Sequence, residues 1–351
     1  MEVATKITGV GSYIPDNEIT NDYVLSLLER KSRPYINDDI FDDFLQKTKD
    51  KLNRVGSDIR YWCDETEYCT DIAYSAAVTA LEDAGVLPEE VDLVIFTGMS
   101  KALVEPATAH ILSKALGTVN ANVLDTQDAC TSFMKSMQLA DALIKTHQYK
   151  KILIASGERS FDWADFTCKT IDEIKWKFAS LTIGDAAGAI VLESTTEPEY
   201  VNNEKHFKFY YKLFSKFVSN CTIGLNHTIG ERYKLFSHST NLIRNGYSAT
   251  HDLVHEIFSS DRWVDYMYDR LICHNVGNVV DNYIKEILQS ANKYYEGKYI
   301  PFFAKYGNVA SATLPLEMTI ARQEKRLNRG DSVMFIVPAA GVQCGIMIFQ
   351  Y

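Results

Sequence analysis

An internal repeat is the feature of this sequence that most restricts its fold. The apolar segment DLVIF (92–96) is matched by RLICH (270–274). Farther along, KILIAS (151–156) is matched by SVMFIV (332–337), and GAIVLE (188–193) is matched by GIMIFQ (345–350), with a long insertion in the first copy. Similar segments that recur in the same order predict two copies of one structural unit. We therefore expect a duplicated chain whose halves, 1–195 and 196–351, meet between residues 194 and 205.

The repeated segments predict an α/β protein. They are short and rich in β-branched residues, and helix-like stretches separate them, which is typical of buried strands in α/β folds. Helices are expected at 71–84, with Thr70 as N-cap and Gly85 after its end, at 278–288, and at 131–144, which is apolar on nearly every side. Strands are expected at 7–13, 93–97, 121–125, 152–155, 189–192, 271–274, 333–337 and 345–349.

Length and composition exclude several classes of protein. A chain of 351 residues is long enough for two packed halves. With 36 Lys+Arg against 46 Asp+Glu, the net charge of −10 argues against a nucleic-acid partner. No apolar run is long enough for a membrane helix, and the first residues lack the pattern of a signal peptide, so we expect a cytoplasmic protein. The seven cysteines are scattered without a CxxC pair, which predicts neither a disulfide framework nor a zinc site.

Cys130 is the candidate nucleophile. It lies in DTQDACTSF (125–133), directly after an expected strand and at the start of the apolar helix. The amides and the macrodipole at a helix N-terminus favour the thiolate form of a cysteine. The alternative interpretation is an inert cysteine of the core.

His274 and Asn308 are the candidate partners of Cys130. The repeated segments that begin at residues 92 and 270 are 178 residues apart, and the same offset leads from Cys130 to Asn308. The repeat therefore brings Cys130 and Asn308 to equivalent helix starts. His274 follows a strand in LICHNVGN (271–278), and strand ends of this kind surround the ligand crevice of open α/β sheets. A Cys, a His and an Asn together supply a nucleophile, a base and a donor that polarises a thioester carbonyl. Each of the two partners alone has a structural alternative, as a strand-end histidine or a turn asparagine.

Two other sequence patterns resemble ligand sites but lack the residues that such sites need. His251 and His255 have the spacing of two helical metal ligands, but no HExxH frame accompanies them, and we expect no metal site. The segment GDAAGA (184–189) lacks the Walker lysine and the GxGxxG spacing, so its glycines are interpreted as sites of close backbone packing.

Motifs spread over almost the whole chain share one resemblance. They are GVGSYIPDNEITN (9–21), SDIRYW (57–62), PATAHILSKALG (106–117), DACTSF (128–133), IGDAAGAIVLE (183–193), YGNVASATLPL (306–316) and GDSVMFIVPAAGVQCGIMIF (330–349). As a set they resemble the thiolase-fold condensing enzymes, and among them the β-ketoacyl-acyl carrier protein synthase III family.

The resemblance implies a fold and a chemistry. It implies the thiolase fold, a duplicated five-layered α-β-α-β-α arrangement with pseudo-twofold symmetry, and a homodimer. It also implies an acyltransferase in which Cys130 takes an acyl group from a coenzyme A or carrier-protein thioester, followed by decarboxylative Claisen condensation, with no cofactor beyond that thioester. His274 and Asn308 would stabilise the enolate, the amides of Cys130 and Ala340 would form the oxyanion hole, and Arg60 would contact coenzyme A.

Departures from the family pattern leave the substrate open. Thr131 and Ser132 follow the cysteine where a small residue and Gly are usual, and Val279 replaces an arginine that docks the carrier protein. Glu105 stands where the family has an apolar residue near the acyl pocket, which suggests an unusual acyl group and specialised polyketide or fatty-acid-like metabolism. Two alternatives remain: acyl transfer to an oxygen or nitrogen acceptor with His274 as general base, and a non-catalytic partner subunit of a condensing enzyme.

Overall fold

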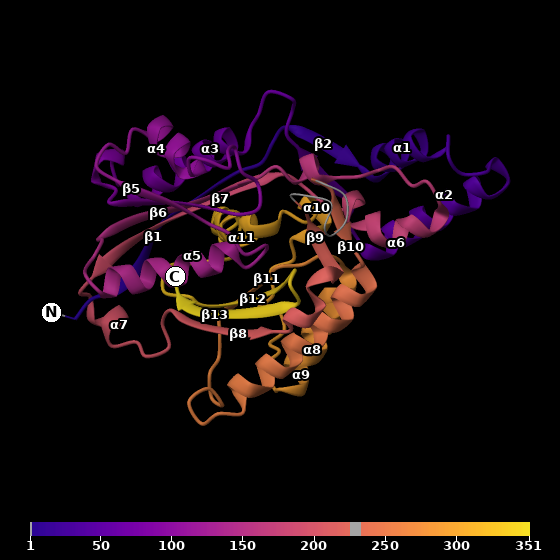
Figure 1. Cartoon of the computed structure of the whole chain (residues 1–351). Coiled ribbons are helices and arrows are strands. Elements are labelled where there is room, and N and C mark those ends of the chain that lie inside the picture. The colour runs from indigo at the N-terminus through magenta and orange to yellow at the C-terminus, as the bar shows by residue number, and fades with distance from the viewer. Residues whose placement is uncertain (1, 225–232) are drawn as a thin grey trace.

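Two β-sheets form the framework of the computed structural model, which describes residues 2–224 and 233–351. They lie one above the other with helices between and outside them (Figure 1). The first sheet has the order β1-β7-β6-β4-β5, and the second has the order β11-β12-β13-β8. Their strands are β1 (Ala4–Tyr13), β4 (Leu93–Thr97), β5 (Asn122–Thr126), β6 (Lys151–Glu158), β7 (Ala186–Thr195), β8 (Lys208–Leu213), β11 (Arg270–Cys273), β12 (Ser332–Ala339) and β13 (Gln343–Gln350).

The strand directions confirm the internal repeat. In the first sheet β1 and β6 are both antiparallel to β7, and β6 is parallel to β4. In the second sheet β8 and β12 are both antiparallel to β13, and β12 is parallel to β11. The chain crosses from one sheet to the other between Thr195 and Lys208, through the short helix α7 (Pro198–Val201). This crossing overlaps the junction expected from the repeat, whereas the division into separate domains stays a prediction.

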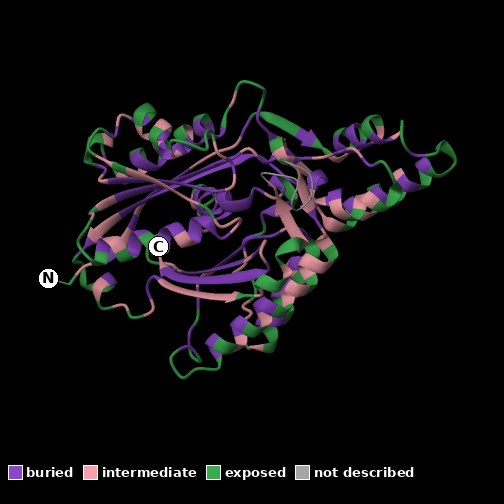
Figure 2. Ribbon diagram, viewed as in Figure 1, coloured by how far each residue is buried: buried purple, intermediate pink, exposed green. Residues whose placement is uncertain are grey.

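Five layers result from the way helices cover the sheets. Two helices, α5 (Ser132–Lys145) and α11 (Thr313–Gln323), lie between the sheets, while α3 (Cys69–Ala84) and α4 (Thr108–Leu116) cover the outer face of the first. The outer face of the second sheet is covered by α8 (Ser239–Phe258) and α9 (Asn278–Ser290). The central strands of both sheets and most of the two middle helices are buried, whereas the edge strand β8 is intermediate and the outer helices expose one side (Figure 2). This is the α-β-α-β-α arrangement of the thiolase fold.

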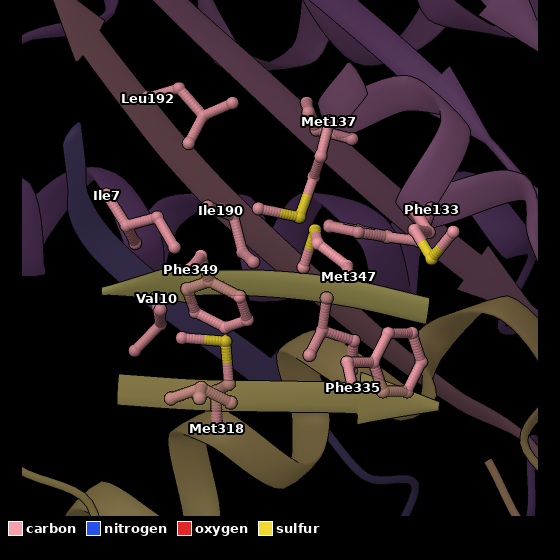
Figure 3. Packing of buried hydrophobic residues seen from close by; sticks show 14 of the residues in the cluster. Ile7, Val10, Phe133, Met137, Ile190, Leu192, Met318, Phe335, Met347 and Phe349 are labelled. Carbon is pink, nitrogen blue, oxygen red and sulfur yellow. The ribbon is translucent and has the colours of Figure 1, made fainter. Parts of the chain in front are cut away.

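The middle layer explains the apolar character of residues 131–144. Phe133 and Met137 of α5 pack against side chains of both sheets, among them Ile190 and Met347 (Figure 3). A helix with a sheet on either side must be apolar on more than one face. Each fully buried side chain of this size contributes about 1.5–3 kcal/mol.

All eight strands expected from the sequence are present, with ends that differ by a few residues. One cap differs from the expectation. Helix α3 begins at Cys69 with Tyr68 as N-cap, because the Asp71 carboxylate accepts a hydrogen bond of 2.8 Å from the Tyr68 amide. Thr70 therefore lies inside the first turn, and Gly85 ends the helix at a φ of +65° as expected.

The remaining elements are additions to the repeated core. An arm is formed by α1 (Asn21–Ser32) and α2 (Asp38–Val55), with β2 (Asn17–Thr20) and β3 (Ile59–Trp62) at its base (Figure 1). In sequence, α6 (Ile174–Lys177) lies between β6 and β7 of the first sheet, and α10 (Phe303–Tyr306) precedes Asn308. An antiparallel ribbon of β9 (Cys221–Ile223) and β10 (Leu235–Ser237) lies between β8 and β11 of the second sheet. Within the described part of the chain, no helix has the length and apolar character needed to cross a bilayer.

Glu317 is a buried acid in the middle layer. It lies on α11, and neither of its carboxyl oxygens has a hydrogen-bond partner among the described residues. Burial and the nearby Asp281 raise the pKa of Glu317 well above 4.5. Asp281, on α9, accepts a hydrogen bond from the Tyr299 hydroxyl, and burial raises the pKa of Asp281 as well. Glu317 is therefore protonated in the folded protein over a pH range in which the unfolded chain is ionised.

We expect this acid to make stability depend on pH. The folded state binds the proton more tightly, so stability is lost as the pH rises from about 4.5 toward the folded pKa, by up to about 1.4 kcal/mol per pH unit. Glu317→Gln removes the titration and keeps the shape. In urea unfolding, the variant should be more stable than the wild type at pH 8, and the difference should shrink toward pH 4.5. A difference that stays constant between these pH values would contradict the assignment.

Candidate active site

A cavity of about 780 Å³ lies where strands of the first sheet end. The three parallel strands β4, β5 and β6 contribute the residues at or just beyond their carboxyl ends, including Met99, Cys130 and Ser160. The second half of the chain contributes Asn308 and Ala340. The cavity therefore occupies the crevice at the strand ends, where the sequence predicted a ligand site.

A tight turn presents Cys130 to this cavity. Ala129 has a φ of +48°, a left-handed conformation that is uncommon for residues other than glycine. The Ser132 hydroxyl accepts a hydrogen bond of 2.7 Å from the Asp128 amide and donates one of 2.6 Å to the Ala129 carbonyl. The Thr131 hydroxyl donates to the Asp128 carbonyl at 2.7 Å. The two residues that depart from the family pattern thus stabilise the turn that carries the cysteine.

The surroundings of Cys130 favour the neutral thiol. Burial raises the pKa of Cys130 above its usual value, and the nearby Cys221 and Glu158 raise it further. The backbone amides of Ala340 and Cys130 act in the opposite direction and offset only part of the rise. The expectation that the helix start leaves a thiolate is therefore wrong for this state, because desolvation is the larger effect. A base must take the thiol proton before the sulfur can attack.

The same two amides lie where an oxyanion hole is expected. Both the Ala340 and the Cys130 N–H groups interact with the cysteine sulfur. They come from opposite halves of the chain, one after β12 and the other before α5. Two amides beside a nucleophile can stabilise the charge that develops on a carbonyl oxygen under attack.

His274 is held as a neutral imidazole. Its Nδ1 lies 2.9 Å from the Thr313 hydroxyl, which itself donates a hydrogen bond of 2.8 Å to the Ala310 carbonyl. Because the hydroxyl proton is used there, we assign the imidazole proton to Nδ1, which leaves Nε2 with a free lone pair. Burial lowers the pKa of His274 to about 4, and Nε2 has no hydrogen-bond partner among the described residues. His274 is not among the described residues that line the cavity, and its link to the lining residue Ala310 runs through the Thr313 hydroxyl.

Asn308 lines the cavity with a fixed backbone. Its amide donates to the Thr182 carbonyl, and its carbonyl accepts from the Gly184 amide, both at 2.9 Å. Its side-chain Oδ1 accepts a hydrogen bond of 2.9 Å from the Ala310 amide, so Nδ2 is the group left to donate. A Cβ on Gly184 would lie 2.3 Å from the Tyr306 carbonyl oxygen. This contact confirms the interpretation of Gly184 as a site of close backbone packing, whereas a Cβ on Gly188 would lie 2.5 Å from the side chain of Pro315.

Arg60 and Glu105 lie outside the lining of the cavity. The Arg60 side chain is 0% exposed and donates hydrogen bonds to Asn21 Oδ1 and Ser57 Oγ, both at 2.8 Å. The structure thus assigns Arg60 to the interior at the base of the arm, which corrects the expected contact with coenzyme A. Glu105 is exposed and directly follows Val104, which lines the cavity, so its expected place near the acyl pocket stays a prediction.

Arg60→Ala should therefore act on stability. A hydrogen bond to a charged group contributes about 1.5–3 kcal/mol, and this substitution removes two such bonds and leaves a cavity. We expect a clear decrease in the urea midpoint, with the KM for a coenzyme A donor unchanged in the protein that remains folded. A raised KM at unchanged stability would restore the original prediction.

Sequence reasoning missed two features of the site. Cys221, on β9, is a second cavity-lining cysteine within the described residues. Glu158 is fully buried and accepts hydrogen bonds from the Met99 and Ser100 amides and from the Ser311 hydroxyl. It therefore joins the cavity wall after β4 to the segment that follows Asn308. The available signal was a carboxylate at the end of the apolar run KILIASGE.

Comparisons with known proteins agree with this geometry. Residues 124–207 match the family model for 3-oxoacyl-[acyl-carrier-protein] synthase III, and residues 267–351 match the model for its C-terminal part. The β-ketoacyl-[acyl-carrier-protein] synthase III of Rickettsia canadensis is 24% identical over 350 residues, which is 99% of each chain. That of Xanthomonas euvesicatoria is 23% identical over 355 residues, again 99% of each chain.

Solved structures share the fold over the whole chain. The synthase III of Aquifex aeolicus superimposes with a TM-score of 0.79 at 21% identity and covers 99% of this chain and 100% of its own. Xanthomonas campestris OleA with bound lauric acid and lauroyl-CoA superimposes with a TM-score of 0.82 at 20% identity and covers 100% and 99%. The matched family models, the full-length relatives and the common fold together show that this chain is a thiolase-fold protein similar to the β-ketoacyl-acyl carrier protein synthase III enzymes along its whole length.

Proposed function

We propose that the protein forms an acyl thioester on Cys130 from an acyl-coenzyme A or acyl-carrier-protein donor and uses it in a decarboxylative Claisen condensation. The product would belong to specialised polyketide or fatty-acid-like metabolism. The observation that carries the proposal is the position of the Cys130 sulfur, on the wall of the cavity and beside the Cys130 and Ala340 amides. No cofactor beyond the thioester substrate is part of the proposal, and the cytoplasm is the proposed location.

Acylation begins with the transfer of the thiol proton. His274 is neutral at physiological pH, because burial lowers its pKa to about 4, and Nε2 accepts the proton of Cys130. The sulfur then bonds to the thioester carbonyl carbon, and the oxyanion is held by the Cys130 and Ala340 amides. When the carbon–sulfur bond to the donor breaks, coenzyme A leaves as a thiolate and takes from His274 the proton that came from Cys130. His274 returns to its neutral form.

Condensation uses the two polar partners together. A malonyl thioester loses its carboxylate as carbon dioxide, and the electron pair left behind gives an enolate. Nδ2 of Asn308 and, in the neutral tautomer protonated at Nε2, His274 donate hydrogen bonds to the enolate oxygen. The enolate carbon bonds to the acyl carbonyl carbon, the bond to sulfur breaks, and the Cys130 thiolate takes a proton from water.

Acyl transfer to an oxygen or nitrogen acceptor is the second candidate. The assignment of the imidazole proton to Nδ1 favours it, because a free Nε2 lone pair suits a general base acting on an alcohol or amine. Release of carbon dioxide with a new carbon–carbon bond would indicate condensation, whereas an ester or amide product would indicate transfer. The intact Cys130, His274 and Asn308 argue against a non-catalytic subunit.

A homodimer is part of the proposal. Strand β5 lies at the edge of the first sheet, and its residues are only partly buried. Val104 and Val119 are 95% and 78% exposed at the two ends of the segment that leads from the cavity wall to β5. An edge strand beside exposed apolar side chains can pair with a second copy. Sedimentation equilibrium should give twice the chain mass of 39.7 kDa, and a monomer at micromolar concentration would contradict it.

Intact-protein mass spectrometry tests the acyl-enzyme directly. The protein is incubated with acyl-coenzyme A thioesters of increasing chain length, including the lauroyl thioester because Leu103, Ile223 and Leu235 give the cavity apolar walls. We expect one acyl group per chain, with a chain-length optimum. Absence of any adduct across the panel, and with the same acyl groups on a carrier protein, would contradict the proposed function.

A further inference from the structure

A network of side chains joins the two oxyanion-hole segments. Gln343, the first residue of β13, is only 3% exposed. Its Nε2 donates hydrogen bonds to Asp128 Oδ2 at 3.0 Å and to the Ala340 carbonyl at 3.2 Å. Its Oε1 accepts a bond of 3.4 Å from the Lys135 ammonium group. One side chain therefore contacts both the turn that bears the Ala340 amide and the turn that bears Cys130.

Asp128 is held at the other end of this network. Lys135 forms an ion pair with Asp128, and the Thr131 hydroxyl donates to Asp128 Oδ2 at 2.8 Å. Hydrogen bonds from Lys135, Thr131 and Gln343 outweigh the effect of burial and keep the pKa of Asp128 below its usual value. The carboxylate is thus charged and anchored two residues before the nucleophile.

The turn that bears the Ala340 amide lies beyond the last hydrogen-bonded pair of strands β12 and β13. The hairpin between β12 and β13 turns at Gly341 and Val342, which have φ values of +80° and +50°. Ladder pairing ends at Ala339 and Gln343, so Ala340 lies outside the sheet. The Val342 carbonyl accepts a hydrogen bond of 2.7 Å from the Phe214 amide, which holds the turn to the second sheet. The Gln343 side chain adds the hydrogen bonds that link the turn to Asp128 in the first half of the chain.

We propose that Gln343 is a positioning residue for acyl transfer, because it ties the Ala340 turn to the Asp128 turn and so sets the spacing of the two amides beside the Cys130 sulfur. The proposal rests on the acyl-enzyme function proposed above. Gln343 does not touch the reacting atoms. It acts through Ala340, and Asp128 and Lys135 are its anchors.

A comparison of two reactions of the same thiol tests the proposal. Acylation by a thioester uses the oxyanion hole, whereas alkylation by iodoacetamide needs the thiol but has no carbonyl oxyanion to stabilise. In Gln343→Leu we expect single-turnover acylation of Cys130 to slow by about 10-fold or more. Alkylation should slow by less than about threefold, since the Ala340 amide has only a small effect on the pKa of the Cys130 thiol. Equal slowing of both reactions, or of neither, would overturn the proposal.

Exchanging the carboxylate and the amide between residues 128 and 343 separates a loss of positioning from a general loss of structure. Gln343→Glu alone places two carboxylates against each other and should be slower in acylation than Gln343→Leu. Adding Asp128→Asn restores a donor and an acceptor, with Lys135 still paired, and should recover at least about 10-fold of the loss. Gln350→Leu on the same strand, where Gln350 accepts a bond from Asn203 far from the cavity, is the matched control and should change neither rate. A double variant that acylates no faster than Gln343→Glu would contradict the assigned contact.

Hydrogen exchange keeps this test independent of the substrate. Amides of the 338–343 turn should exchange faster in Gln343→Leu than in the wild type, while those of β5 stay unchanged. If no thioester acylates the wild type, the proposed function fails, and the exchange rates still decide whether Gln343 restrains the turn. Unchanged exchange in the turn would overturn the positioning role.

Discussion

Cys130→Ala protein is expected to form no covalent adduct with any acyl thioester that labels the wild type. The expectation follows from the location of the Cys130 sulfur on the cavity wall beside two backbone amides. No other described thiol combines these features, so the loss should be complete within detection. Intact mass measured after a fixed incubation gives the fraction of acylated chains.

Cys221→Ala is the matched control for this experiment. Cys221 lines the same cavity and influences Cys130, so it is the thiol that could substitute for the nucleophile. Its variant should keep full adduct stoichiometry, as should Cys273→Ala and Cys344→Ala, whose side chains are buried elsewhere in the core. Acylation of undiminished stoichiometry on Cys130→Ala would refute the assignment, and its loss on Cys221→Ala would move the nucleophile to that residue.

His274 and Asn308 should affect different steps. Asn308→Ala is expected to load acyl groups at the wild-type rate but to lose about 10²–10³ in turnover, because it removes one donor to the enolate oxygen. His274→Ala should lose turnover to at least the same extent and should also load slowly near neutral pH, since burial raises the pKa of Cys130 and the variant lacks the proton acceptor. Rapid-quench loading and steady-state product formation separate the two steps.

The pH dependence of acyl loading tests whether His274 accepts the proton of Cys130. His274 is unprotonated above about pH 4, so wild-type loading should be nearly level between pH 6 and pH 8. In His274→Ala the reactive species is the thiolate, whose fraction rises about tenfold per pH unit below the raised pKa of Cys130. His255→Ala, which changes a histidine on the outer helix α8 bonded to Ser290, should match the wild type in both measurements. Full turnover by Asn308→Ala together with an inactive His274→Ala would favour acyl transfer to a heteroatom over condensation.

Local pattern was enough to predict the elements of the repeated core. The apolar runs that became β4, β6 and β12 are bounded by turn residues and are buried on both faces, so they read as continuous strands. The edge strand β8 of the second sheet and the added strands β9 and β10 were not predictable in the same way. Strand β8 is an edge strand with half-buried residues, and the three-residue strands β9 and β10 are too short to show a period.

The repeat also predicted which residues meet. Because equivalent helices start at equivalent strand ends, the offset between Cys130 and Asn308 placed both at one cavity. The family motifs added Ala340, which interacts with the Cys130 sulfur. The same motifs misplaced Arg60, because a short sequence match does not show whether a side chain turns outward or, as here, donates to Asn21 and Ser57 inside the protein.

Periodicity and order along the chain by themselves thus determined the duplicated α/β architecture, whereas the catalytic roles of Cys130, His274 and Asn308 stay predictions. The protonation states depended on the tertiary structure alone. The amides of Ala340 and Cys130 lower the pKa of the Cys130 thiol, but desolvation, together with Cys221 and Glu158, raises it by more. The network of Asp128, Lys135 and Gln343 was also hidden, because it joins side chains that are more than 200 residues apart in sequence and come together only when the two halves pack.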